Sequence, residues 1–201
     1  MGLKSHVISS VSRGPDLPAK VDPVRQAEIS IFPEFEAELS QEWLQRVLEG
    51  ALGVALEPNE PAQVSLVIAG DATVRGLNAQ FRGLDEVTDV LSFSANHPGH
   101  WQGESELAAD RYIQPGNEAA FPFPTLDGGP PPLGEVIISL PQARRQSKER
   151  DEPLDRELAL LIVHGVLHLV GHEHLESEET ALMQGREQAA LSSLIANGIT
   201  Q

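Results

Sequence analysis

The sequence predicts a single α+β domain in which a small mixed sheet of about four strands packs against helices. Three observations indicate this fold class. The chain has 201 residues, of which 40% are hydrophobic, which is enough for one sizeable core and short for two domains. Strand-like and helix-like hydrophobic periods alternate along its first half. Residues 153–170 are apolar nearly all round the helix period, as in a helix buried at the centre of a fold.

The first half of the chain predicts an N-terminal tail followed by alternating strands and helices. Residues 1–24 mix Ser, Gly, Pro and charge without periodicity, so we expect a mobile tail and then one domain over residues 25–201. Ser40 and Asp71 each stand directly before a helical pattern and are expected N-caps. The expected elements are a strand at 27–32, a helix at 41–56, a strand at 63–70, a helix at 72–82 and a strand at 88–93.

Residues 95–132 are rich in Pro and Gly and interrupt this order. A compact domain rarely contains a structureless loop of this length, so we expect an insertion that leaves the core and returns to it. Pro141 and Pro153 are each expected to open a helix, because proline suits the first helical turn. After the insertion the expected elements are a strand at 133–140, a helix from Pro141 to about Arg150, the buried helix at 153–170 and an amphipathic helix at 177–198.

The composition excludes several kinds of site. The chain has no cysteine, which excludes disulfides, thiolate nucleophiles and zinc sites built on Cys. Any metal must therefore be held by His, Asp or Glu. The sequence contains neither a signal-peptide pattern nor 18 consecutive apolar residues, so we expect a cytoplasmic protein without a membrane partner.

The charge distribution bears on nucleic-acid binding. A formal net charge of −16 argues against binding through a global positive field, and no DNA partner is expected. Residues 144–150 nevertheless concentrate positive charge that would form a local patch if acidic residues lie elsewhere. The alternative is a solvated helix face, which such charge runs usually are. The four cations of this basic run are Arg144, Arg145, Lys148 and Arg150.

The segment HGVLHLVGHEH at 164–174 carries four of the seven histidines of the chain. His164 and His168 are four residues apart on a helix, so both rings can reach one metal ion. Gly171 can take the left-handed conformation that ends a helix, which would bring His174 back to the same point. The pattern H-x-x-x-H-x-x-G-x-x-H has the metal spacing of metzincins. Three imidazoles with an open fourth position suit a catalytic zinc ion.

Two alternatives to a catalytic site of this kind follow from neighbouring residues. The metzincin pattern requires Glu after the first His, as the peptidase general base, and this chain has Gly165 there. Peptide hydrolysis is therefore the less expected reaction. A structural zinc ion would need a fourth protein ligand, for which His172 is the candidate. His172 also competes with His174 for the third ligand position.

Three segments resemble one known family. The histidine segment is similar to the signature HGxLHLxGyDH of the YbeY family, single-domain bacterial endoribonucleases that mature ribosomal RNA. The segment LNAQFRGLDEVTDVLSF at 77–93 resembles that family's LNxxyRxkdxpTDVLSFp, and LGEVIIS at 133–139 resembles its LGDIvIS. The likeness covers roughly residues 60–93 and 133–190. Three ordered motifs at the expected gaps make a specific resemblance.

The resemblance implies one zinc ion per chain, bound by His164, His168 and His174. It also implies that Arg82 is the functional arginine beside this site. A guanidinium there can clamp a phosphate and stabilise charge that develops in the transition state. From the residues alone, Arg82 would instead form an ion pair with Asp85 or Asp89.

The function that the resemblance implies is a single-strand-specific, metal-dependent endoribonuclease. It would act in ribosomal RNA maturation, including the 3′ end of 16S rRNA, and in ribosome quality control, with ribosomal RNA and the small ribosomal subunit as partners. The basic run would guide the RNA, and Glu173 is a candidate general base. The alternatives are a metal hydrolase of another substrate, including peptides, and a non-enzymatic ribosome-assembly factor with a structural zinc.

The sequence departs from the family pattern in three places. His172 and Glu173 stand where the family usually has Tyr and Asp, and Leu84 stands where Lys is common. The insertion at 95–132 separates two blocks that the family keeps closer together. None of these departures touches the three inferred ligands.

Overall fold

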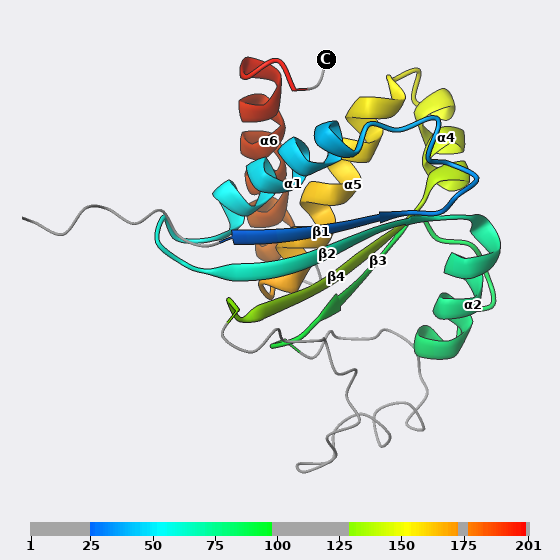
Figure 1. The fold of residues 1–201 in the computed structure, drawn as a ribbon, viewed down its shortest axis with the longest axis horizontal. Helices are drawn as coiled ribbons and strands as arrows, with labels where there is room; N and C mark the ends of the chain where they lie inside the picture. Colours follow the sequence, from blue (N-terminus) through cyan, green and yellow to red (C-terminus); the bar gives the residue numbers. More distant parts are fainter. Residues whose placement is uncertain (1–24, 98–128, 173–176, 200–201) are drawn as a thin grey trace, which may run out of the picture.

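Four strands form one sheet with helices on both of its faces in the computed structural model of the protein (Figure 1). The structure describes residues 25–97, 129–172 and 177–199. The elements are β1 (Arg25–Ile31), α1 (Gln41–Ala55), β2 (Ala62–Ala69), α2 (Asp71–Arg82), β3 (Val90–Ser94), β4 (Pro132–Ser139), α4 (Leu140–Glu149), α5 (Leu154–Leu169) and α6 (Ser177–Ala196). The predicted α+β fold with a small mixed sheet is confirmed.

The strand order is β1-β2-β4-β3. β1, β2 and β4 run parallel, and β3 joins β4 antiparallel at the edge of the sheet. The connection from β3 to β4 therefore begins and ends at the same side of the domain: Ser94 pairs with Gly134, and the Ala95 amide donates to Leu133 O at 3.0 Å. Both described ends of the predicted insertion lie together. Residues 98–128 of it, like the predicted tail at 1–24, lie outside the described residues.

Two apolar clusters cover the two faces of the sheet. On one face, α1, α5 and α6 pack over alternate residues of β2 and β4, such as Leu66 and Ile138, which are fully buried. On the other face, α2 packs Val74 against Ile137 and Leu91. Burial of one such side chain stabilises the fold by about 1.5–3 kcal/mol. α5 lies at the centre of the larger cluster, as the sequence predicts.

The sequence places one helix cap correctly and one wrongly. Ser40 caps α1 as predicted, and its hydroxyl accepts from the Trp43 amide at 3.3 Å. Asp71 is not a cap: Gly70 occupies the N-cap position of α2, and Asp71 lies in the first turn. Its carboxylate accepts instead from Ser139 Oγ at 2.6 Å and from Arg145. The Asp71 carboxylate therefore bonds Ser139 and Arg145, which are distant in sequence, instead of capping the backbone amides of α2.

The remaining corrections concern element ends. Pro141 is the second residue of α4, because Ser139 is its N-cap and accepts from the Gln142 amide. Pro153 is itself the N-cap residue of α5. β3 begins at Val90 rather than at residue 88, and the Asp89 carboxylate just before it accepts from the Val90 amide at 2.8 Å. Such shifts of one or two residues are typical of element ends.

Candidate active site

His164 and His168 meet on one side of α5. Their Nε2 atoms lie 3.1 Å apart, and their rings are 4.6 Å apart at an angle of 78°. The predicted i, i+4 pair is therefore brought together in space. Nδ1 of His164, on the other edge of the ring, lies 2.7 Å from Glu187 Oε1 of α6. Glu187 is a site residue that the sequence analysis missed, because nothing local links it to a histidine 23 residues away.

The two Nε2 atoms suit a shared metal ion. Two nitrogen ligands of a tetrahedral zinc ion, each about 2.0–2.1 Å from the metal, lie about 3.3 Å apart. The observed separation of 3.1 Å is close to this value. The described residues contain no group of three or more His, Asp or Glu side chains arranged to hold a metal. His174 and Glu173 lie outside the described residues, so the third ligand and the general base stay predictions.

α5 ends as the sequence predicts. Gly171 has a φ of +85°, in the left-handed region. Its amide donates to His168 O at 3.0 Å, and the His172 amide donates to Leu167 O at 3.0 Å. These two bonds are the Schellman motif, which satisfies the last carbonyls of a helix and reverses the chain. The chain therefore leaves α5 next to the histidine pair.

His172, the competing ligand, follows this turn. Burial lowers the pKa of its imidazole below the ordinary value, and the charge of Arg186 lowers it further. A neutral imidazole is the form that can bind a metal. This leaves His172 chemically able to compete for the third ligand position.

A further histidine that sequence reasoning missed lies against the same turn. The exposed His97, three residues beyond β3, packs its ring over Gly171, where a Cβ atom would lie 3.1 Å from Nδ1. Its amide donates to Ser94 Oγ at 3.0 Å, and that hydroxyl donates to Leu169 O at 2.8 Å. The end of β3 is thus tied to the end of α5.

Gly165 faces the sheet. A Cβ atom at this position would lie 2.6 Å from Val136 Cγ1 and 3.2 Å from Ser92 Oγ. A glutamate there, as in metzincins, would point into the core rather than toward a substrate. The structure thus gives a steric reason why the peptidase base is absent.

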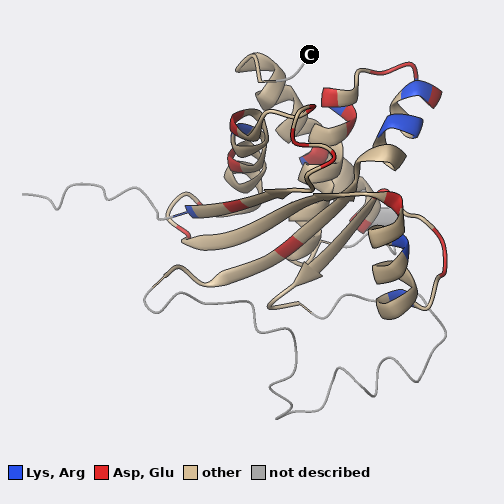
Figure 2. Cartoon of the chain, turned by 45° about the vertical axis from the view of Figure 1, so that its right-hand side comes forward, with Lys and Arg blue, Asp and Glu red and all other residues tan. Residues whose placement is uncertain are grey.

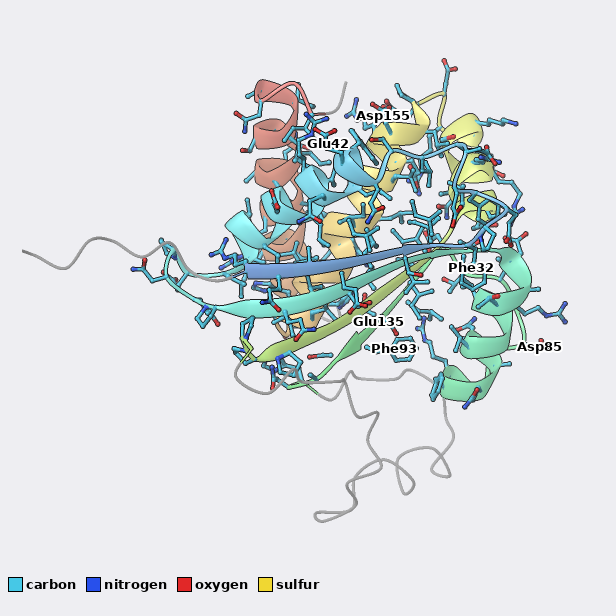
Figure 3. The ribbon with its side chains drawn as sticks, in the orientation of Figure 1. Phe32, Glu42, Asp85, Phe93, Glu135 and Asp155 are labelled. Carbon is cyan, nitrogen blue, oxygen red and sulfur yellow. The ribbon has the colours of Figure 1, made fainter. Side chains whose placement is uncertain are left out.

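Arg82 lies at the end of α2, on the face of the sheet opposite α5, and its side chain is half-buried. Its neighbour Phe81 packs edge to face on Phe93 of β3, with ring centres 5.2 Å apart, on the side of the sheet that α2 covers (Figure 3). Leu169, the neighbour of His168, contacts the next residue of the same strand, Ser94. Arg82 and the histidine pair therefore lie on opposite faces of the sheet, and a chain neighbour of each contacts the end of edge strand β3.

The ion pairs that the residues alone suggest for Arg82, with Asp85 or Asp89, are not formed. Asp85 pairs instead with Arg75, at 2.7 Å. Asp89 accepts from Gln146 Nε2 at 2.9 Å as well as from the Val90 amide. Within the described ranges, Arg82 has no hydrogen-bond or ion-pair partner. Its guanidinium is therefore available to a ligand.

The basic run lies on α4 and its C-cap residue, and Figure 2 colours the Lys and Arg positions of this helix blue. Three of its four cations have carboxylate partners. Arg144 pairs with Glu38, and Arg145 pairs with Asp71 at 2.9 Å. Hydrogen bonding and charge from Arg145 hold the pKa of the Asp71 carboxyl below its usual range, against the opposing effect of burial.

The third ion pair of the basic run, between Arg150 and Glu157, is more buried. Nη1 of Arg150 lies 2.8 Å from the Glu157 carboxylate, whose side chain is only 2% exposed. Burial raises the pKa of Glu157, and the charge of Arg150 opposes that rise. Lys148 has no ion pair among the described residues. The run thus presents less free positive charge than the sequence indicates, and RNA binding by it stays a prediction.

Most of the chain matches a known family. The family model described as endoribonuclease YbeY matches residues 26–195. Endoribonuclease YbeY of Desulforamulus reducens is 35% identical over 160 residues, which cover 78% of this chain and 90% of that protein. The Moorella thermoacetica protein of the same name is 40% identical over 154 residues, which cover 75% and 84% of the two chains.

A solved structure shares the fold. The solution structure of a Thermotoga maritima protein is 17% identical, with a TM-score of 0.50, and the match covers 87% of this chain and 95% of that chain. At this identity the likeness concerns the fold alone. No helix in the described part of the chain is long and apolar enough to cross a membrane. On the family match and the relatives together, the chain belongs to the YbeY family of endoribonucleases.

Proposed function

We propose that this protein is a zinc-dependent endoribonuclease that cuts single-stranded RNA during ribosomal RNA maturation. The observation that carries the proposal is the histidine pair of α5, whose Nε2 atoms lie 3.1 Å apart in a chain of the YbeY family. His164, His168 and His174 would hold the metal. Its substrate would be precursor RNA at the 3′ end of 16S rRNA, on the small ribosomal subunit in the cytoplasm, in maturation and in quality control.

The chemistry divides between the metal and the residues of the chain. A bound zinc ion supplies Lewis-acid activation of water or of the scissile phosphate. Arg82 would clamp a phosphate oxygen and stabilise the negative charge that grows on it, because its guanidinium has no partner among the described side chains. The chain neighbours of Arg82 and His168, Phe81 and Leu169, contact adjacent residues of β3, and we propose that one phosphate at this edge is contacted from both faces of the sheet.

The nucleophile distinguishes two versions of this reaction. In one, Glu173 acts as general base and takes a proton from water, which leaves a 5′ or 3′ phosphate on the product. In the other, the 2′-hydroxyl of the substrate attacks the phosphate, and the product carries a 2′,3′-cyclic phosphate. The end groups of the RNA products, read by mass spectrometry, separate the two.

The experiment compares metal content and RNA cleavage in matched variants. His168→Ala removes a proposed ligand, and Arg82→Ala removes the proposed phosphate clamp. Arg75→Ala is the control, because Arg75 lies on the same helix as Arg82 and pairs with Asp85 on the surface. We expect His168→Ala to lose both zinc and cleavage. Arg82→Ala should keep zinc and lose about 10²–10³ in cleavage rate, the usual effect of removing one transition-state donor.

Other outcomes would contradict specific parts of the proposal. If zinc is lost and cleavage is unchanged, the metal is structural. If zinc is retained in His174→Ala, His172 is the third ligand. If Arg82→Ala leaves RNA ends unchanged in cells while ribosome association depends on α4, the protein is an assembly factor rather than a nuclease. Turnover of peptides is not expected, because position 165 is packed against Val136.

A further inference from the structure

Glu187 of α6 stands directly behind the histidine pair. Its Oε1 lies 2.7 Å from Nδ1 of His164, and its side chain is only 16% exposed. The other ring nitrogen of His164, Nε2, points at His168. The carboxylate therefore contacts the edge of the imidazole that is turned away from the proposed metal position.

This contact selects one form of the ring. The oxygens of a carboxylate group accept hydrogen bonds. Nδ1 of His164 must then carry the proton, which leaves the lone pair of a neutral ring on Nε2. In the opposite tautomer, a lone pair on Nδ1 would face the carboxylate at 2.7 Å, which is unfavourable. The contact also holds the ring against rotation.

Within the described part of the chain, no Lys or Arg pairs with the Glu187 carboxylate. Glu187 lines a cavity of about 300 Å³, whose other lining residues include Arg150 and Arg156. Arg150 is paired with Glu157, and Arg156 lies 3.1 Å from Glu152. Among the ion pairs of the described residues, His164 is the sole partner of Glu187.

We propose that Glu187 is a positioning residue that fixes the tautomer and orientation of His164, so that Nε2 is presented to a divalent metal ion. The inference rests on the proposed function for the presence of the metal. A carboxylate behind a histidine ligand also raises the basicity of that ligand, and its loss commonly weakens metal binding about 10–100-fold. This gives α6 a role in the site, although it supplies none of the proposed ligands.

The test measures zinc affinity and ring tautomer in the full-length protein. Zinc dissociation constants are determined by competition with a chromophoric chelator. Tautomers are read from the ¹⁵N chemical shifts of the His164 ring in the metal-free protein. Glu187→Ala should bind zinc about 10–100-fold more weakly and should gain the form protonated at Nε2. Glu187→Gln keeps an acceptor oxygen at the same place, so it should lie between Glu187→Ala and the wild type.

Two controls separate the hydrogen bond from other effects. Gln184→Ala truncates another α6 side chain of the same cavity and should leave both readouts unchanged. The double variant Glu187→Gln, Gln188→Glu keeps the net charge but moves the carboxylate one residue round the helix. It should behave like Glu187→Gln. A return to wild-type affinity would mean that charge alone matters, which would overturn the inference.

The inference also fails if Glu187→Ala binds zinc as tightly as the wild type, or if the His164 tautomer does not change. Urea unfolding of each metal-free variant shows whether the fold is intact, and the isosteric Glu187→Gln serves if Glu187→Ala does not fold. The affinity readout uses zinc alone, the tautomer readout uses the metal-free protein, and neither needs RNA. If the Glu187 variants show these effects but the wild-type protein does not cut RNA, the proposed function is overturned and the role of Glu187 stands.

Discussion

α4 and α5 follow one another in the chain, and the sequence assigns a functional role to each, but their polar side chains meet different partners. On α5, His164 and His168 face each other one helical turn apart. On α4, Arg144 and Arg145 are engaged by carboxylates from other elements, Glu38 and Asp71. The difference teaches that spacing within a helix fixes the geometry of a site, whereas the charge that a basic run presents depends on distant counter-ions.

Packing accounts for part of this contrast. α5 is buried on most sides. Because a buried polar group without a hydrogen bond is costly, the polar side chains of α5 need partners close to the helix. α4 is buried only along Leu140, Ala143 and Ser147, and its two arginines pair with carboxylates from outside the helix. A chain with a net charge of −16 supplies such partners readily.

The largest effect is expected from Gly165, where α5 lies against the sheet. Gly165→Glu would recreate the peptidase motif, but its side chain would collide with Val136 and bury a carboxylate. We expect a loss of about 3 kcal/mol or more in the free energy of unfolding and no peptidase activity. Gly53→Ala on α1 is the control, since nothing lies within 4 Å of its Cβ position, and it should gain about 0.5–1 kcal/mol. Urea unfolding with a peptidase assay checks both, and a stable Gly165→Glu protein would refute the packing argument.

An intermediate effect is expected at Arg150, where α4 meets α5. Arg150→Ala leaves the buried Glu157 carboxylate without its partner, which should cost about 1–3 kcal/mol near neutral pH. Because burial already raises the pKa of Glu157, the folded protein holds that proton more tightly than the unfolded chain does. The stability that comes from protonated Glu157 is present at low pH, and it is lost as pH rises through the pKa of Glu157 in the folded protein.

Loss of Arg150 removes the charge that opposes this rise, so the pKa of Glu157 should increase further. The destabilisation of Arg150→Ala should therefore grow between about pH 5 and about pH 8. Unfolding curves across this range measure it. Adding Glu157→Gln should remove the pH dependence, and a destabilisation that is equal at both ends of the range would contradict the assignment.

The smallest effect is expected from the cations on the surface of α4. If α4 guides RNA, Lys148→Gln should reduce the slope of log affinity against log salt by about 0.7, the value for one phosphate contact with a single strand. Arg144→Gln should change the slope less, because Glu38 already engages that guanidinium. Titrations of single-stranded RNA at several salt concentrations measure both slopes. Unchanged slopes in both variants would contradict RNA binding by α4. They would favour the alternative, in which the basic run is only a solvated helix face.

The sequence by itself determined the features that depend on a few neighbouring residues. Hydrophobic periods located every strand and helix of the described chain to within a few residues at each end, because burial of one face repeats with the period of the element. Ser40 caps α1, Gly171 ends α5, and His164 lies beside His168, since each of these contacts spans no more than one or two helical turns.

Only the tertiary structure decided which distant side chains meet. The partners of Asp71, Arg144 and His164 come from other elements, and neither Glu187 nor His97 has a local pattern that marks it. Arg82 lies across the sheet from the histidines, and their chain neighbours Phe81 and Leu169 contact β3, the edge strand in the order β1-β2-β4-β3. Strand order is set by how the whole core packs, so no local spacing encodes which charges and ligands it brings together.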